Sequence, residues 1–225
     1  MYRSICAILV LTFTSLFLVL PLTMEATAGN EAGNSITVVY HHIPGGSGAD
    51  LEPQGGFSAC VRFNGQAILF DTGGERSVLV DNMRALGIDP YGLDAIVISH
   101  NHWDHVYGLP GLSKMTGENP PVYVPASAED GIRQQNPRAE LVAVKKSVEI
   151  SPGIWVVGPL ELEYRGFHLS RAPESDLDAI VASLRELGVP GLAPGHCTGD
   201  HAVDVFREIW GAEVLSFNLG DTLRI

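Results

Sequence analysis

The run from Ser99 to His105 constrains the fold more than any other stretch of this 225-residue chain. It places three histidines and one aspartate directly behind residues 95–98, an apolar run rich in β-branched side chains that predicts a buried strand. α/β folds usually carry their chemistry on loops at the carboxyl ends of strands. The alternative is a group of solvated loop histidines, but an ordinary loop does not need so many metal-binding side chains. The run therefore predicts an α/β fold with a metal site at one sheet edge.

The spacing within this run divides its side chains between two metal ions. Alternate residues of an extended segment point the same way, so His100 and His102 can hold one ion together. Asp104 and His105 then turn toward a second ion. Imidazole and carboxylate together suit Zn²⁺, and Mn or Fe is a possible substitute. Two ions roughly 3.5–4 Å apart would polarise a substrate oxygen and hold a bridging hydroxide, so we expect up to two divalent ions and hydrolytic chemistry.

Further candidate residues stand at other predicted strand ends. Asp71 follows the apolar residues 67–70, and we expect it to accept a hydrogen bond from a ligand imidazole and so fix the tautomer. An ordinary turn-capping aspartate is the alternative. His168 and His196, each in a glycine-containing motif, are the expected distal metal ligands. Cys197 is interpreted as a packed thiol in preference to a thiolate ligand.

Three other histidines have less defined roles. His41 and His42 follow the first predicted strand and are candidates for the substrate side of the site. His201 is expected to be a surface residue at the start of a helix.

The composition limits the partners of the chain. Fourteen basic and 26 acidic residues give a net charge of −12, which argues against a surface that coats nucleic acid or docks on anionic lipid. Bound metal ions would still allow a small anionic substrate. We therefore expect a small-molecule substrate, no nucleic acid and no membrane contact after processing.

The first 28 residues predict a signal peptide. A short basic start precedes an almost wholly apolar run over residues 5–20, which Pro21 ends, and Ala26-Thr27-Ala28 supplies a small-x-small cleavage pattern. An uncleaved membrane anchor is the alternative. We expect residues 1–28 to be removed and residues 29–225 to form one secreted or periplasmic domain.

Strands and helices alternate along the rest of the chain. The turn Asn64-Gly65 predicts a hairpin. This pattern favours an α/β sandwich of mixed sheets over a doubly wound parallel sheet. The expected strands are residues 36–40, 57–63, 67–70, 95–98, 122–124, 141–144, 154–157 and 213–216, and the main helices are residues 78–86, 177–187 and 202–210.

Several motifs resemble one known family. The chain is similar to the metallo-β-lactamase superfamily, in its branch of 7,8-dihydropterin-6-methyl-4-(β-D-ribofuranosyl)aminobenzene 5′-phosphate synthase-like proteins. This resemblance implies an αβ/βα sandwich of two mixed sheets flanked by helices, with a dinuclear metal site at the edge of the sheets. The motifs are Gly-Phe-Ser at 56–58, Ile-Leu-Phe-Asp-Thr-Gly at 68–73, His-x-His-x-Asp-His at 100–105, Ile-Ser-Pro-Gly-Ile at 150–154, Gly-Phe-His-Leu at 166–169 and His-Cys-Thr-Gly at 196–199.

The chain departs from this branch at one place. Relatives carry several tens of residues between the motifs at 150–154 and 166–169, including strands and a Gly-Cys-Ser-His whose histidine completes the first metal site. Here only residues 160–165 lie between Pro159 and Gly166, and Gly-Cys-Ser-His does not occur. The first site is expected to bind metal more weakly than the second, and one sheet is expected to lack a strand pair.

The main hypothesis is a secreted hydrolase that uses metal-bound hydroxide on an ester-, phosphoester-, lactone- or lactam-type bond, with Asp104 as the catalytic carboxylate. The alternative is a non-catalytic or weakly active relic of the fold that still binds metal. Two bound metal equivalents per chain would favour the enzyme over the relic.

Overall fold

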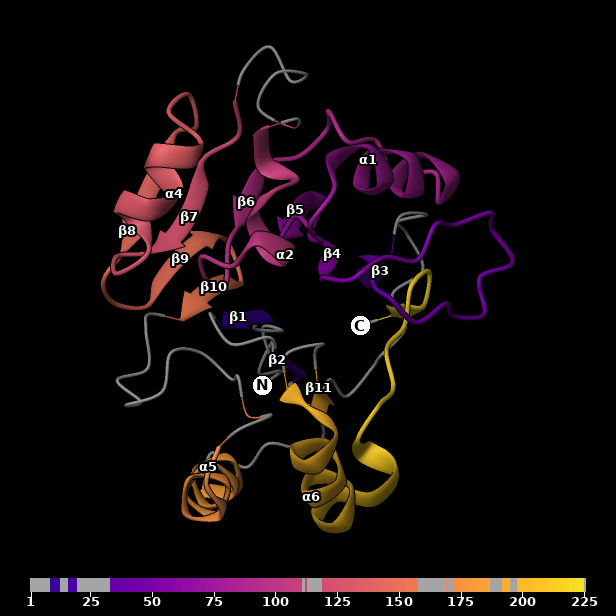
Figure 1. The fold of residues 1–225 in the computed structure, drawn as a ribbon, viewed down its shortest axis with the longest axis vertical. Helices are drawn as coiled ribbons and strands as arrows, with labels where there is room; N and C mark the ends of the chain where they lie inside the picture. The colour runs from indigo at the N-terminus through magenta and orange to yellow at the C-terminus, as the bar shows by residue number, and fades with distance from the viewer. Residues whose placement is uncertain are drawn as a thin grey trace, which may run out of the picture.

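A computed structural model describes residues 9–12, 16–19, 33–110, 112, 119–157, 169, 172–186, 192–194 and 198–224. Its elements form two β-sheets with helices on the outer side of each (Figure 1). His168, His196 and Cys197, which the sequence proposes as site residues, lie outside the described residues.

The larger sheet is mixed and carries the site at one edge. Its seven strands run in the order β12-β3-β4-β5-β6-β7-β8. The first four pair antiparallel and β5 to β8 pair parallel, so the carboxyl ends of β5 and β6 lie at the same edge. The strands are β3 (Ser35–Tyr40), β4 (Ser58–Phe63), β5 (Gln66–Phe70), β6 (Ala95–Val97), β7 (Val122–Pro125), β8 (Leu141–Val144) and β12 (Thr222–Arg224).

The turn between β4 and β5 confirms the predicted hairpin. Asn64 and Gly65 have φ of 50° and 81°, the pair of positive values that a type I′ turn requires. Because this turn fixes the register, Cys60 pairs with Leu69 and Phe70 with Ala59. β5 therefore ends directly before Asp71.

Three buried clusters define the layers of the sandwich. One face of the large sheet packs against α1 (Arg76–Ala85), with Leu69, Leu79 and Met83 fully buried between them. The other face packs against Ile154 and Val156 of the smaller sheet. A third cluster joins the smaller sheet to α5 (Glu174–Glu186) and α6 (Asp200–Trp210). Figure 1 shows α1 and α4 (Glu129–Gln135) at the opposite end of the molecule from α5 and α6, which confirms the αβ/βα arrangement.

The N-terminal apolar run supplies two strands of the smaller sheet. β1 (Leu9–Thr12) pairs parallel with β10 (Ile154–Val157), and β2 (Leu16–Val19) pairs antiparallel with β11 (Leu192–Pro194). The full order is β11-β2-β1-β10-β9, with β9 spanning Val148–Ser151. These two strands occupy the middle of the sheet from which the sequence predicts a strand pair to be missing. Removal of residues 1–28 stays a prediction.

The end of the chain differs from the sequence prediction. A strand over residues 213–216 is wrong: Gly211–Glu213 forms the 3₁₀ turn η3, and Val214 makes only an isolated bridge to Leu192. The chain must leave the α6 layer there and cross to the large sheet, so it cannot continue along β11. It turns at Gly220, whose φ is 83°, and then adds β12 beside β3.

Within the described ranges, no helix has both the length and the apolar character needed to cross a membrane.

Candidate metal centre

Two neighbouring strands deliver the central residues of the site. β5 ends at Phe70 and β6 at Val97, and these residues are paired in register. Asp71 follows β5 with a left-handed φ of 56°, and its N–H donates to the carbonyl of Val97 at 2.8 Å. The hydroxyl of Ser58 donates to the Asp71 carbonyl at 2.7 Å. This bent backbone directs the Asp71 side chain toward the residues that follow β6.

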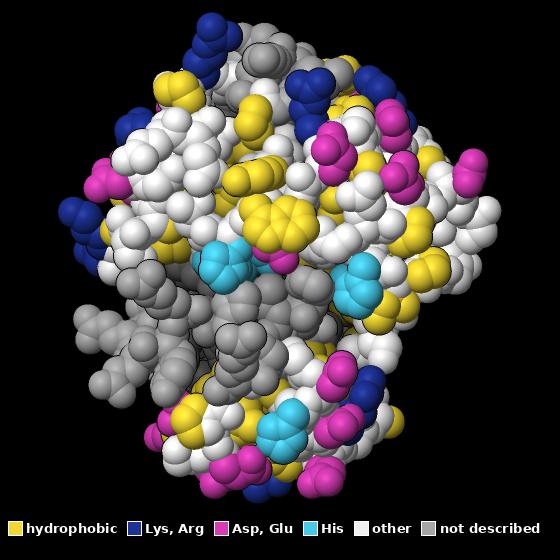
Figure 2. All heavy atoms as spheres, in the orientation of Figure 1, with side chains coloured by type: hydrophobic (Ala, Val, Ile, Leu, Met, Phe, Trp, Pro, Cys, Tyr) yellow, Lys and Arg dark blue, Asp and Glu magenta, His cyan; other side chains and the backbone are white. Residues whose placement is uncertain are grey.

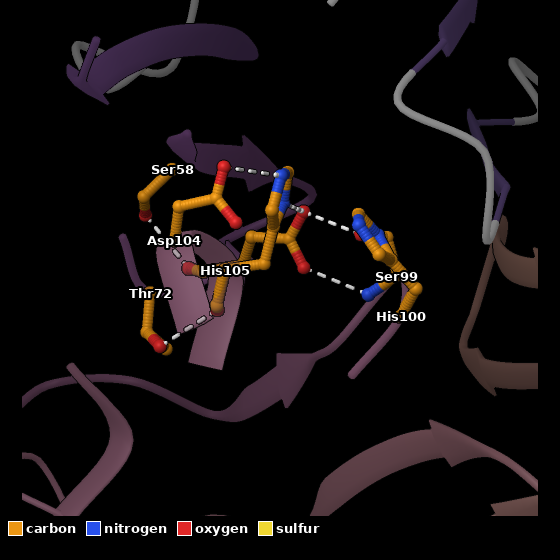
Figure 3. A network of polar contacts seen from close by, with 7 residues as sticks. Ser58, Thr72, Ser99, His100, Asp104 and His105 are labelled. Atoms are coloured by element: carbon orange, nitrogen blue, oxygen red, sulfur yellow. Dashed lines mark hydrogen bonds and ion pairs between the residues drawn. The ribbon is translucent and has the colours of Figure 1, made fainter. Parts of the chain in front are cut away.

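The Asp71 carboxylate is fully buried and accepts three short hydrogen bonds. Its Oδ1 accepts from the Ser99 N–H at 2.7 Å, and its Oδ2 accepts from the Ser99 hydroxyl at 2.7 Å. Oδ2 also accepts from Nδ1 of His105 at 2.7 Å. Figure 3 shows these residues drawn together from the two strand ends. The predicted role of Asp71, orienting a histidine of the cluster, agrees with this geometry.

The protons of this network fix the tautomers of two histidines. A carboxylate only accepts, so His105 carries a proton on Nδ1, and in the neutral imidazole Nε2 has the lone pair. The Ser99 hydroxyl gives its single proton to Asp71, so it accepts from Nδ1 of His100 at 2.8 Å. Nε2 of His100 then also has a lone pair. One buried carboxylate thus prepares both imidazoles to act as metal ligands through Nε2.

The candidate ligands of the first motif lie close together. The ring centroids of His100 and His105 are 4.2 Å apart, and those of His100 and His102 are 4.5 Å apart. Nε2 of His105 lies 3.8 Å from Oδ2 of Asp104. His105 is completely buried, the Asp104 side chain is 16% exposed and His102 is exposed. The cluster therefore opens to solvent on the His102 side.

Backbone contacts hold α2 (Trp103–Val106) against the strand ends. Both the N–H and the hydroxyl of Thr72 donate to the carbonyl of His105, at 2.8 and 2.9 Å. The N–H of Phe57 donates to the carbonyl of Asp104 at 3.2 Å. A Cβ on Gly108 would collide with the Thr72 carbonyl, so this close approach requires glycine. The ligand pair Asp104 and His105 is consequently fixed from both sides.

The other predicted histidines divide into two groups. His41 is buried, its ring lies 4.5 Å from that of His42, and its edge contact with Phe57 has a centroid distance of 6.3 Å. Phe57 contacts the His41 ring and donates its N–H to the Asp104 carbonyl, so it links the two histidines to the segment that carries Asp104. His201 is confirmed as a surface residue at the start of α6, with Nε2 3.0 Å from Glu174.

The described residues fit a metal centre in their donor chemistry. His100, His102, Asp104 and His105 supply imidazole nitrogens and a carboxylate oxygen, the donors that zinc and similar ions take. In the part of the chain that the structure describes, no three such side chains are already gathered at metal-binding distance. His168 and His196, the predicted remaining ligands, are not among these residues.

Ser99 belongs to this network although the sequence motifs assign it no role. Its side chain is 1% exposed and connects Asp71 to His100. Its position between the β-strand and the first histidine was visible in the sequence, but its role depends on Asp71, 28 residues away.

Comparisons with known proteins identify the family of this chain. A sequence model described as the metallo-β-lactamase superfamily matches residues 51–210. A protein of Methanocaldococcus jannaschii, named 7,8-dihydropterin-6-methyl-4-(β-D-ribofuranosyl)-aminobenzene-5′-phosphate synthase, is 22% identical over 66% of this chain and 81% of its own length. That name is the branch the motifs predict. The match extends over 239 positions, more than the 225 residues of the whole chain, so the relative carries residues that this chain lacks.

One further sequence match is shorter, and another match is to a solved structure. A ribonuclease Z of Clostridium perfringens is 42% identical over 28% of this chain, a stretch that covers 19% of its own length. The crystal structure of a diphosphatase from the PhnP family superposes with a TM-score of 0.57, covering 86% of this chain and 98% of the diphosphatase at 16% identity. The structural likeness supports the two-sheet fold.

Proposed function

Because the chain belongs to the metallo-β-lactamase superfamily, we propose that it is a metal-dependent hydrolase with a site for up to two divalent ions, zinc in the first place. The names diphosphatase and ribonuclease Z among its matches support hydrolase-type chemistry. The observation that carries the proposal is the hydrogen-bond network around Asp71, which engages Nδ1 of His105 directly and Nδ1 of His100 through Ser99, so that neutral imidazoles present Nε2 to a metal.

Each residue of the cluster has a distinct task in this proposal. His100 and His102 hold one ion, Asp104 and His105 hold the other, and His168 and His196 complete the ligand set. A divalent ion bound here supplies a Lewis acid that polarises the substrate and acidifies water. Asp104, on the solvent side of buried His105, orients the attacking water and accepts its proton. Asp71 keeps His105 in the ligand tautomer throughout.

A phosphoester is the bond class that the comparisons favour for a first assay. One sequence relative is named a ribonuclease and one structural match a diphosphatase, and both names denote cleavage of a bond at phosphorus. The net charge of −12 opposes a long polyanionic substrate, so we propose a small phosphoester. Lactone, carboxylic ester and lactam substrates form the comparison panel.

Purified chain should hydrolyse a chromogenic phosphodiester, should lose this activity with a chelator and should recover it on addition of zinc. His102→Ala should lower both bound metal and turnover. His201→Ala is the matched control, because His201 is an exposed histidine on α6 with no part in the cluster. Zinc-independent turnover, or equal activity in His102→Ala, would contradict the proposal. Bound metal without turnover on any of the four substrate classes would support a metal-binding relic instead.

Export belongs to the same proposal and rests on the N-terminal sequence. Residues 1–28 carry the apolar run and the Ala-Thr-Ala pattern of a signal peptide, so we propose a secreted or periplasmic enzyme whose mature chain begins at Gly29.

A further inference from the structure

An exposed aromatic pair stands beside the opening of the metal cluster. Trp103 is 58% exposed and Tyr107 is 53% exposed, and both lie on or directly after α2, which also carries Asp104 and His105. Their ring centroids are 6.5 Å apart. Figure 2 shows hydrophobic side chains directly beside a histidine at the surface of this face. The exposed side of the cluster, at His102, is therefore next to an aromatic surface.

The loop after Asp71 packs against the indole ring of Trp103. A Cβ added to Gly74 would lie 2.6 Å from Cζ3 of Trp103, so glycine allows the ring to rest against the loop. The next N–H, of Glu75, donates to the hydroxyl of buried Tyr40 at 3.0 Å. The N–H of Gly108 donates to the carbonyl of Gly73 at 3.2 Å. These two hydrogen bonds fix the backbone on both sides of Gly74.

The contact with Gly74 distinguishes Trp103 from an isolated aromatic side chain on the surface. Trp103 is held in one place by its contact with Gly74, yet more than half of its surface stays in water beside the cluster. A fixed indole next to a polar centre offers a flat surface at small entropic cost, the property that makes tryptophan effective in recognition. Planar groups stack on such a surface.

We infer that Trp103, with Tyr107 at its side, is the specificity-determining residue for a planar aromatic group on the non-leaving side of the scissile phosphoester. This inference rests on the proposed function, since the metal cluster supplies the other half of the substrate contact. The aromatic group would stack on the exposed indole while the phosphoryl group faces His102 and Asp104. A nucleobase and a fused heterocycle share this chemistry.

Two phosphodiesters with the same leaving group test the inference. Bis(p-nitrophenyl) phosphate and methyl p-nitrophenyl phosphate both release p-nitrophenolate, but only the former keeps a second aromatic ring. Trp103→Ala should raise KM for the bis-aryl diester roughly tenfold, the usual effect of losing one stacking partner, and leave the methyl diester nearly unchanged. Trp103→Phe should restore most of the difference, and bound metal should stay at the wild-type level. Tyr91→Ala removes a comparably exposed aromatic at 40% and serves as the control.

A binding measurement separates this inference from the proposed function. p-Nitrobenzylphosphonate carries a nitroaromatic quencher and no hydrolysable ester, so it should quench wild-type fluorescence more than that of Trp103→Phe. Wild-type tryptophan fluorescence that the phosphonate leaves unquenched would overturn the inference, as would an equal KM rise for both diesters. If neither diester is hydrolysed, the proposed function fails, while the quenching result still decides whether Trp103 binds aromatic groups. Adenosine monophosphate and a pterin monophosphate, used as competitors, distinguish a nucleobase from another fused heterocycle as the aromatic group.

Discussion

Replacing Asp71 by Asn should leave the fold intact and weaken metal binding. Asn retains the size of Asp and tolerates the left-handed φ of 56°, so the backbone after β5 should keep its path. The amide oxygen can accept the Ser99 N–H in place of Oδ1. The amide nitrogen then faces Nδ1 of His105, which must become an acceptor and move its proton to Nε2. The side chain that should bind metal thereby loses its lone pair.

The substitution should change both the free energy of unfolding and the affinity for metal. A bond to a charged group contributes about 1.5–3 kcal/mol and a neutral one about 1 kcal/mol, so conversion of three should lower the free energy of unfolding by about 1.5–6 kcal/mol. Loss of the orienting carboxylate should weaken metal binding by about 10–100-fold. Asp71→Ala should lower the free energy of unfolding further, because it leaves buried donors without acceptors and because Ala tolerates the left-handed φ less well than Asp or Asn.

Urea denaturation and competition with a chromogenic chelator measure the two quantities. Asp94→Asn is the control, because Oδ2 of Asp94 accepts the Ala67 N–H at 2.7 Å at the opposite end of β6. It should change metal affinity little. If Asp71→Asn binds metal as tightly as the wild type, the tautomer argument is refuted.

Four further outcomes are expected. Elemental analysis should show less bound metal in His102→Ala and in Asp104→Ala, since a methyl group replaces neither ligand, and retention of full metal in His102→Ala would remove that residue from the site. Ser99→Ala should weaken the His100 ion more than the Asp104–His105 ion, a difference that a two-step zinc titration resolves, because only His100 depends on the Ser99 hydroxyl. Burial raises the pKa of the Cys60 thiol from 9.0 to about 11, so mass spectrometry should find it unlabelled by iodoacetamide at pH 8, and the free energy of unfolding should fall between pH 9 and 11 because the unfolded thiol ionises first. N-terminal sequencing of the exported protein should begin at Gly29, and a retained Met1 would favour an anchor.

The local parts of the fold could be predicted because short-range rules determine them. The positive φ values at Asn64 and Gly65 follow from the hairpin chemistry of that pair. Gly87, at φ 69°, ends α1 as expected for a glycine after a helix, and its N–H donates to the carbonyl of Arg84. The buried strand before His100 followed from its β-branched residues.

The features that could not be predicted from the sequence depend on contacts between residues far apart in the chain. The expected strand at 213–216 failed because its apolar residues lie where the chain crosses between layers, and periodicity does not encode that crossing. Ser99 received no role because its partners are set by the pairing of β5 with β6. The pairing of β1 with β10 was missed since a leader-like run gives no sign of a sheet partner.

The position of β1 and β2 bears directly on processing. Cleavage after residue 28 would remove both strands, leaving β10 paired only with β9 and β11 without its partner β2. Unpaired strand edges favour association with other chains. Comparison of the thermal stability and association state of the full chain with those of residues 29–225 would measure what the two strands contribute.

Zinc titration of the metal-stripped chain tests the central claim most directly. The account predicts at least one tightly bound equivalent per chain, held by Asp104 and His105 and lost in Asp104→Ala, followed by a weaker equivalent at His100 and His102. Turnover of the phosphodiester should rise with the second equivalent, because both ions act on the same substrate. A chain that binds no zinc at stoichiometric concentration, or binds it equally in Asp104→Ala, would contradict the assignment of this cluster as the metal centre.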